Sequence, residues 1–247
     1  MPENIRTFCL LAEIIDFIWP RVCEVCGRPV DRPGRHVCSD CLNRLPFAPT
    51  DGCCRQCGRA AEQLDGEFLC EECRTGRPAF DRVASALHFD DEARAAINAF
   101  KFRAHLWLRD DLVDWMEAAV RARFKVGEIE LVLPMPSTFW HRFDRGCNQC
   151  AYLARALARR IDRPYAESVL RRTGRPRRQG GLTEADRRAN VVGTFAVRRP
   201  GLIAGKTVLV VDDIMTTGST LSECAATLKA AGAARVWCAT VARTWRG

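Results

Sequence analysis

Two adjacent carboxylates and a hydroxyl-rich turn form the segment of this 247-residue sequence with the clearest chemistry. In VLVVDDIMTTGSTL (208–221) an apolar run predicts a buried strand that ends at Asp212 and Asp213, whose carboxylates can accept hydrogen bonds from neighbouring sugar hydroxyls. The turn that follows consists of Thr216, Thr217, Gly218, Ser219 and Thr220. It opens an expected helix, where N–H groups and the helix dipole favour a phosphate dianion and glycine allows close approach. The segment therefore predicts a site for a ribose 5-phosphate.

The same turn has a purely structural interpretation. Thr220 and Glu223 have the spacing of a capping box at the start of a helix. That interpretation does not explain two adjacent acids at the end of a strand, because buried carboxylates without partners are costly. We therefore favour the phosphate site.

Eight of the fourteen cysteines form four CxxC pairs in a stretch poor in large apolar residues. The pairs are Cys23/Cys26, Cys38/Cys41, Cys54/Cys57 and Cys70/Cys73. Each CxxC turn can direct two thiolates at one ion, and two such turns complete a tetrahedral Zn²⁺ site. A stretch with so small a core also needs such a staple in order to fold. The pattern predicts two structural Zn²⁺ ions, with no open position for catalysis.

Two ways of pairing the CxxC turns satisfy the ligands. Sequential ribbons join 23/26 with 38/41 and 54/57 with 70/73, whereas a cross-brace interleaves the pairs. We favour the sequential arrangement because its closures are short and local. Cys53 is an alternative ligand next to Cys54, although the spacing from Cys54 to Cys57 fits better.

The remaining cysteines have different surroundings. Cys147 and Cys150 form a fifth CxxC at the start of an expected helix, far from any second pair. We interpret them as small half-buried residues, with a redox or metal role as the alternative. Cys9, Cys224 and Cys238 lie in apolar segments and are expected in the core.

The N-terminal segment has helical apolar spacing rather than the pattern of an export signal. In residues 8–19, Glu13 and Asp16 interrupt the apolar run, and neither a basic region nor a cleavage site accompanies it. We expect an amphipathic helix packed on the protein; the alternative, a membrane-surface helix, would need Lys and Arg on its polar face. No run approaches the roughly 18–20 apolar residues that span a bilayer. These features favour a cytoplasmic protein, in which thiols stay reduced and bind metal.

From residue 79 onward, apolar runs of strand length alternate with helical patterns. Strands are expected near 82–88, 130–134, 168–172, 193–198, 206–211 and 235–242, and helices near 91–102, 106–123, 146–161 and 219–231. This alternation predicts an α/β fold around a mostly parallel sheet. We divide the chain into an N-terminal helix (1–19), a double zinc ribbon (20–78) and an α/β domain (79–247). The positive charge belongs to the last part, where 28 basic residues outnumber 18 acidic ones, while the ribbons carry nine of each.

Together these motifs resemble a known family. VVDDIMTTGST is similar to the signature of type I phosphoribosyltransferases, which bind phosphoribosyl pyrophosphate (PRPP). The four CxxC pairs, LPMPSTFWHRFDRGCNQ (133–149), RRQGGLTEADRRANVVGTF (177–195) and that signature follow the order seen in the ComF/GntX family. Its members join a double zinc ribbon to a phosphoribosyltransferase domain. The resemblance covers essentially the whole chain and implies a type I phosphoribosyltransferase fold, with Mg²⁺ bound together with PRPP.

The resemblance also implies roles for individual residues. Asp212 and Asp213 would hold the ribose hydroxyls, and residues 216–220 the 5-phosphate. The resemblance assigns anion-binding roles to three groups of residues. Pro136 and Ser137 follow a strand, Arg142 and Arg145 belong to an R-x-x-RG block, and Lys101 lies at the end of the first helix. Of these, Arg142 and Arg145 join the two aspartates as expected catalytic residues. The family's R-x-x-RGFNQ block has Phe where this chain has Cys147, a departure that concerns packing more than charge.

Residues 171–190 form a Gly-, Pro- and Arg-rich stretch between two expected strands, with seven arginines and two acids. By itself this pattern predicts a solvated basic loop and does not decide whether the loop contacts a phosphate group. The resemblance places it at the mobile active-site loop, which closes over pyrophosphate and excludes water. The residues expected to act there are Arg175, Arg177, Arg178, Gln179, Arg187 and Arg188.

Three functions remain open. As an enzyme, the interpretation toward which we lean, the protein transfers a phosphoribosyl group from PRPP to an acceptor that no motif identifies. As a nucleic-acid binder, its basic domain follows the phosphate backbone of single-stranded DNA, since ComF-family members are associated with natural competence. As an interaction module, the electrically neutral ribbons dock on a competence or repair protein.

Overall fold

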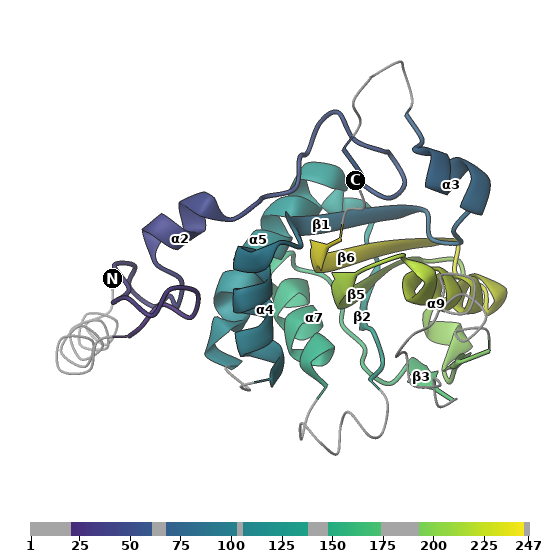
Figure 1. Ribbon diagram of the computed structural model, residues 1–247. Coiled ribbons are helices and arrows are strands. Elements are labelled where there is room, and N and C mark those ends of the chain that lie inside the picture. Colours follow the sequence, from purple (N-terminus) through teal and green to yellow (C-terminus); the bar gives the residue numbers. More distant parts are fainter. Residues whose placement is uncertain (1–20, 61–67, 103–105, 138–147, 174–192, 245–247) are drawn as a thin grey trace.

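The computed structural model describes residues 21–60, 68–102, 106–137, 148–173 and 193–244 (Figure 1). The strands are β1 (Arg82–His88), β2 (Leu131–Pro134), β3 (Leu170–Arg172), β4 (Phe195–Val197), β5 (Thr207–Met215) and β6 (Arg235–Arg243). The α-helices are α2 (Ser39–Arg44), α3 (Glu71–Gly76), α4 (Asp91–Phe102), α5 (Arg109–Arg123), α7 (Gln149–Arg160) and α9 (Ser219–Ala230). Short 3₁₀ turns are η1 (Leu106–Leu108), η2 (Val126–Glu128) and η3 (Pro200–Leu202). Each element expected from residue 79 onward has a counterpart, with its ends displaced by at most four residues.

Four strands form a parallel sheet in the order β1-β6-β5-β2, and β3 pairs with β4 in a separate antiparallel hairpin. Parallel neighbours need crossover connections, which the helices between the strands supply. The expected α/β fold with a mostly parallel sheet is thereby confirmed. The helix expected over residues 8–19 lies outside the described residues, and the domain boundaries at 19/20 and 78/79 stay predictions.

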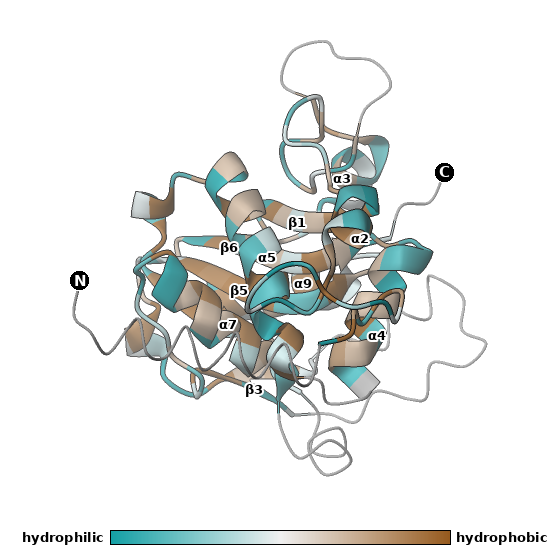
Figure 2. Cartoon of the chain, turned by 90° about the vertical axis from the view of Figure 1, so that its left-hand side faces the viewer, coloured by the Kyte–Doolittle hydropathy of each residue, from teal (hydrophilic) through white to brown (hydrophobic). Residues whose placement is uncertain are grey.

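Both faces of the sheet are covered, as a parallel sheet requires (Figure 1). Along β5, Leu209 and Val211 join the core beneath α4, α5 and α7, whereas Val208 and Val210 join the core beneath α9. Burying each such side chain is worth about 1.5–3 kcal/mol. β5 accordingly runs as an apolar band through the middle of the molecule (Figure 2). The core positions predicted for Cys224 and Cys238 are confirmed, while Cys9 lies outside the described residues.

The central strand β5 is longer than the apolar run predicts, and this corrects the expectation that it ends at the two aspartates. β2 pairs with β5 only as far as Val211, but β6 stays paired up to Met215. Asp212 is therefore still paired with Thr240 of β6, and Asp213 follows it in the same strand, although neither has a partner in β2. Their carboxylates lie at an opening of the sheet, although the strand itself continues.

Two zinc-ribbon modules precede the sheet. We call residues 22–45 the first ribbon and residues 53–77, described except for 61–67, the second ribbon; they contain α2 and α3, which lie on different sides of the sheet in Figure 1. Within the described ranges, no helix has the length and apolar character needed to cross a bilayer.

Candidate functional site

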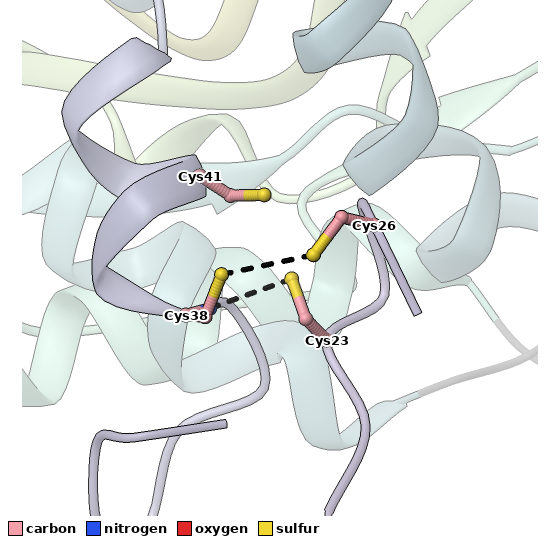
Figure 3. Close-up of side chains that lie close together, drawn as sticks. All are labelled: Cys23, Cys26, Cys38 and Cys41. Carbon is pink, nitrogen blue, oxygen red and sulfur yellow. Dashed lines mark hydrogen bonds between the residues drawn. The ribbon is translucent and has the colours of Figure 1, made fainter. Parts of the chain in front are cut away.

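The first ribbon gathers four cysteine sulfurs around one point. The Sγ atoms of Cys23, Cys26, Cys38 and Cys41 lie within 4.8 Å of one another (Figure 3). Four sulfurs about 2.3 Å from a tetrahedral Zn²⁺ are separated by about 3.8 Å. The distance between the sulfurs of Cys26 and Cys38 is 3.8 Å. The donor set and its spacing therefore fit Zn²⁺.

The second ribbon repeats this arrangement with Cys54, Cys57, Cys70 and Cys73, all buried. The distance between the sulfurs of Cys57 and Cys70 is 3.5 Å, and the backbone N–H of Cys70 donates to the sulfur of Cys54. Both four-cysteine sets follow the chain order, so the sequential pairing is confirmed and the cross-brace is wrong. The neighbouring Cys53 contacts Arg123 and stands outside both sets, which argues against it as a ligand.

At the open edge of β5, the two aspartates have different partners. Lys101, in the last turn of α4, places its Nζ 2.8 Å from Oδ2 of Asp213. Cys150, in the first turn of α7, donates from its thiol to Oδ1 of Asp212 at 3.4 Å. Two helices on one face of the sheet thus bring a cation and a weak donor to the carboxylates. Lys101 thus lies beside the two acids, and its role in binding PRPP stays a prediction.

Burial controls the ionisation of this cluster. It raises the pKa of Asp212 to about 7, with the adjacent negative charge of Asp213 adding to the effect. Burial also raises the pKa of Cys150 well above its usual range, again supported by the two aspartates. A neutral thiol is a poor nucleophile and a poor metal ligand. The packing interpretation of Cys150 is therefore favoured, together with a role as hydrogen-bond donor.

The phosphate loop, as we name residues 216–220, presents unused donors at the start of α9. The backbone N–H groups of Thr217, Gly218 and Thr220 have no hydrogen-bond partner among the described residues. Gly218 precedes the helix with a φ of 77° and without a side-chain cap, and a Cβ added there would lie 2.5 Å from Cε of Met215. The positive φ is what favours glycine here, because Cε is the end of a flexible side chain that can move aside.

The capping-box alternative is wrong. Oε1 of Glu223 accepts a hydrogen bond from the backbone N–H of Gly193 at 2.7 Å, rather than reaching back to the start of α9. This contact connects α9 to the residues that precede β4. The open N–H groups at the helix start suit an anion.

The segment after β2 lies next to the same opening. Oγ of Ser137 is buried and has no hydrogen-bond partner among the described residues. The side-chain amide of Asn148 donates to the carbonyl of Met135 at 3.2 Å, and that of Gln149 donates to the carbonyls of Phe100 and Lys101 at 2.8 Å each. Asn148 and Gln149 therefore position the segment with Pro136 and Ser137 and the end of α4. Arg142 and Arg145 lie outside the described residues.

The base of the 171–190 segment is the β3–β4 hairpin. The residues predicted to act in the segment lie outside the described part of the chain: Arg175, Arg177, Arg178, Gln179, Arg187 and Arg188. Arg172 at the end of β3 stacks 5.4 Å above the ring of Phe195, and its buried Nε has no partner within the described ranges. Burial lowers the pKa of Arg172, and the charge of Asp212 opposes this effect. Sequence reasoning did not single out Arg172, although this residue belongs to the arginine-rich stretch 171–190.

A cavity of about 470 Å³ lies between the phosphate loop and the second ribbon. Residues 215–219 form one wall, and the second ribbon contributes Arg59 and Glu72. Arg243, at the end of β6, lines it and donates from its guanidinium to the carbonyl of Cys57. No motif predicts this cavity, because its walls come from two modules that appear independent along the sequence.

Comparisons with known proteins follow the same division of the chain. The double zinc ribbon domain model matches residues 14–74, and the phosphoribosyl transferase domain model matches residues 148–246. Competence protein F of Haemophilus influenzae is 28% identical over 200 residues, covering 79% of this chain and 85% of that protein. DNA utilization protein YhgH of Escherichia coli K12 is 26% identical over 226 residues, covering 89% and 96% of the two chains.

Among solved structures, adenine phosphoribosyltransferase from Saccharomyces cerevisiae aligns at 16% identity with a TM-score of 0.37, over 58% of this chain and 72% of that one. The phosphoribosyltransferase fold rests on the parallel sheet and the domain match. The two domains occur in this order and the relatives match along most of their length, which supports the ComF family, with a double zinc ribbon before a phosphoribosyltransferase domain.

Proposed function

We propose that this protein binds PRPP at the open edge of β5 and transfers its phosphoribosyl group to an acceptor. One observation carries the proposal: β5 continues past the end of β2, so that two carboxylates lie without a neighbouring strand on one side, close to a loop with unused N–H donors. A ligand that matches both features needs a diol and a phosphate. A ribose 5-phosphate has both.

The carboxylates also restrict the sugar. Each carboxylate oxygen accepts hydrogen bonds and cannot donate them, so Asp212 and Asp213 favour a ribose with two free vicinal hydroxyls. A nucleotide within a DNA strand lacks the 2′-hydroxyl and has its 3′-oxygen esterified. The pair of acids therefore favours PRPP or a ribonucleotide over an internal DNA nucleotide.

The pyrophosphate of PRPP would lie toward α4 and the segment after β2. Lys101 brings a cation there, and Ser137 offers a buried hydroxyl without a partner among the described residues. Arg142, Arg145 and the arginines of the 171–190 segment are the further predicted contacts. Mg²⁺ would neutralise the pyrophosphate, and the carboxylate oxygens of Asp212 and Asp213 are ligands of the kind that it prefers.

In the proposed reaction, the bond from C1 of the ribose to pyrophosphate breaks and a bond from C1 to the acceptor forms. Charge develops on the sugar and on the leaving group, so positioning and electrostatic stabilisation are the main contributions of the protein. Asp212 and Asp213 orient the ribose by its hydroxyls, and Lys101 stabilises the departing charge.

A role in DNA handling is the second candidate, and the names of the relatives favour it: Competence protein F and DNA utilization protein. The net charge of +10 on residues 79–247 suits a phosphate backbone. Single-stranded DNA, or a competence or repair protein, would then be a partner in the cytoplasm. Because the two acids disfavour an internal deoxynucleotide, DNA would bind elsewhere on the basic domain.

Calorimetric titration with PRPP and Mg²⁺ tests the first proposal. We expect Asp212→Asn/Asp213→Asn to weaken binding at least tenfold, while Asp91→Asn on the exposed start of α4 changes it less than twofold. Absence of PRPP binding by the unaltered protein would overturn the proposal. Salt-dependent binding of labelled single-stranded DNA, measured on the same variants, tests the second candidate; loss of DNA binding in the Asp212/Asp213 variant would contradict a separate DNA surface.

A further inference from the structure

The cavity beside the phosphate loop continues the proposed ribose 5-phosphate site on its phosphate side. Residues 216–219 line it, and they are the proposed contacts of the 5-phosphate. Asp212 and Asp213, the proposed contacts of the ribose, do not line it. A ligand held by both features therefore runs from the two acids to the loop and directs its phosphate into the cavity. Any further part of the same ligand in the cavity is bonded to that phosphate.

The cavity is much larger than the phosphate that it would receive. Its volume of about 470 Å³ lies in the range of pockets that bury a whole drug-sized molecule. A phosphate group fills only a small part of that space, and Arg59 and Glu72 of the second ribbon form the far wall. The site thus has room for a ligand whose 5-phosphate is esterified to a second group.

The charges of the lining favour a phosphodiester over a phosphate monoester. Two arginines, Arg59 and Arg243, are balanced by two glutamates, Glu72 and Glu223. A monoester carries about −1.5 to −2 charges at pH 7, whereas a diester carries a single negative charge. Because the lining has no excess of positive charge, the less charged diester enters it at a lower electrostatic cost.

The rest of the lining suits a nucleobase as part of the second group. Pro78, Phe80 and Met215 supply apolar surface. Arg59 donates from Nη2 to Oε1 of Glu72 at 2.7 Å, and its buried Nε has no partner among the described residues. This pair presents a donor beside an acceptor. A nucleobase has apolar planar faces and carries ring acceptors and N–H donors at its edges, so a nucleoside matches both parts of the lining.

The apolar wall of the cavity is held in place from two sides. The side-chain amide of Gln56 in the second ribbon donates to the carbonyls of Pro78 and Phe80. Between them, the backbone N–H of Ala79 donates to Oγ of Ser222 in α9 at 2.9 Å. The segment is therefore fixed both to the ribbon and to the helix that follows the phosphate loop. A ligand meets a preformed wall, so little of its binding free energy is lost in ordering the protein.

The two acids at the other end restrict which phosphodiester fits. The carboxylates of Asp212 and Asp213 need two free vicinal hydroxyls as donors. In a nucleic-acid strand, only the 3′-terminal nucleotide of RNA combines a free 2′,3′-diol with a 5′-phosphodiester. An internal RNA nucleotide has its 3′-oxygen esterified, and a DNA end lacks the 2′-hydroxyl. Dinucleotide coenzymes also have a free diol, but the second phosphate of their linkage would meet a lining without excess positive charge.

We propose that this site binds the 3′-terminal dinucleotide of an RNA strand. The terminal ribose lies on Asp212 and Asp213, its 5′-phosphodiester lies on the phosphate loop, and the penultimate base lies against Arg59 and Glu72. The net charge of +10 on residues 79–247 suits the backbone that leads to this end. The proposal rests on the ribose and phosphate contacts of the proposed function, and it adds the end of an RNA strand to PRPP as a ligand of the same site.

Calorimetric titrations with AMP and with the dinucleotides ApA, CpA, GpA and UpA test the cavity. All five ligands end in the same adenosine with a free diol, and only the dinucleotides have an esterified 5′-phosphate. We expect at least one dinucleotide to bind about tenfold more tightly than AMP, and its deoxy form, without the 2′-hydroxyl, to lose about tenfold. Arg59→Ala and Glu72→Gln should remove most of the advantage over AMP and leave the affinity for AMP within twofold, as loss of about one hydrogen bond predicts.

The first ribbon supplies matched controls. Arg28 and Asp40 hold the same positions relative to its cysteines, and their side chains pair at 3.0 Å on the surface. Arg28→Ala and Asp40→Asn should leave all these affinities unchanged. Zinc content of two ions per chain verifies each variant; should Arg59→Ala lose zinc, the isosteric Glu72→Gln carries the test.

Several outcomes overturn the proposal: no dinucleotide exceeds AMP, the second-ribbon variants weaken AMP and the dinucleotides equally, or the first-ribbon variants have the same effect. A deoxydinucleotide that binds as tightly as its ribose form would assign the cavity to DNA. NAD⁺ that binds more tightly than every dinucleotide, in dependence on Arg59, would assign it to a coenzyme. Failure of PRPP and ribose 5-phosphate to bind overturns the proposed function instead; dinucleotide binding that depends on Asp212 and Arg59 would then preserve the RNA end without PRPP.

Discussion

The two zinc ribbons have the same internal structure and different attachments to the rest of the molecule. In each, the first cysteine N–H donates at 2.7 Å to the carbonyl of the arginine five residues later, Arg28 or Arg59. In each, a glycine with a φ near 75° follows the second cysteine, Gly27 or Gly58. An arginine and an acid at equivalent positions then pair on the outside. Equivalent modules have therefore been joined to different neighbours.

The first ribbon is attached through side chains on α5. The backbone N–H of His36 donates to Asp111 at 2.8 Å, and Arg35 forms an ion pair with Asp114. The second ribbon is attached through its own backbone carbonyls to β1 and β6, and it lines a cavity. Arg28 is 58% exposed, whereas its counterpart Arg59 is 24% exposed. The difference indicates a peripheral module and a module that belongs to the site.

Removal of equivalent zinc ligands should show most clearly that the two ribbons differ in their effect on ligand binding. Cys41→Ser and Cys73→Ser each disrupt one four-cysteine set, and structural zinc contributes on the order of 10 kcal/mol to the folding of small modules. We expect both variants to retain one Zn²⁺ per chain, as measured by metal content. Only Cys73→Ser should weaken dinucleotide binding by tenfold or more; an equal loss in Cys41→Ser would end the distinction between the ribbons.

The second-largest effect concerns Asp111, the buried acid beneath the first ribbon. The side chain of Asp111 is 1% exposed, and burial raises its pKa. Asp111→Ala leaves the N–H of His36 without its acceptor, so chemical denaturation should show a loss of about 1–3 kcal/mol. Asp111→Asn keeps an acceptor oxygen and should lose less. Ribose 5-phosphate affinity should not change, and a fall of tenfold would show that the first ribbon also supports the site.

The third prediction follows from the pKa of about 7 for Asp212. Ribose hydroxyls donate hydrogen bonds to the ionised carboxylate of Asp212, and only about one-tenth of this carboxyl is ionised at pH 6. The affinity for PRPP should therefore be about tenfold weaker at pH 6 than at pH 8. Folding raises this pKa, so the stability of the free protein should instead decrease as pH rises from about 4 to 7. Titrations of Arg28→Ala should follow the same pH profile, and Asp212→Asn should lack it.

Sequence patterns predicted the zinc ligands and the helices and strands far better than the contacts between distant parts of the chain. CxxC spacing identifies zinc ligands because both thiolates come from one local turn, and strand–helix alternation predicts the sheet for the same local reason. The extension of β5 beyond Asp212 depends on pairing with β6, which no local pattern encodes. The contacts of Glu223 with Gly193 and of Arg243 with Cys57 join residues 30 and 186 positions apart, so they were not predicted.

The smallest expected effect compares glycines at equivalent positions of the two ribbons. Gly27 and Gly58 have φ values of 73° and 76°, so an alanine at either costs about 1–2 kcal/mol of stability. A Cβ at Gly27 meets nothing within 4 Å, whereas at Gly58 it lies 3.4 Å from the carbonyl oxygen of Val83 in β1. Since 3.4 Å is an ordinary van der Waals separation, both variants should lose similar thermal stability, and calorimetry should find their affinities for ribose 5-phosphate within twofold of each other. A selective loss of affinity in Gly58→Ala would show that even this contact displaces the cavity wall, because the strain in the turn is the same in both ribbons and only the contact with β1 differs.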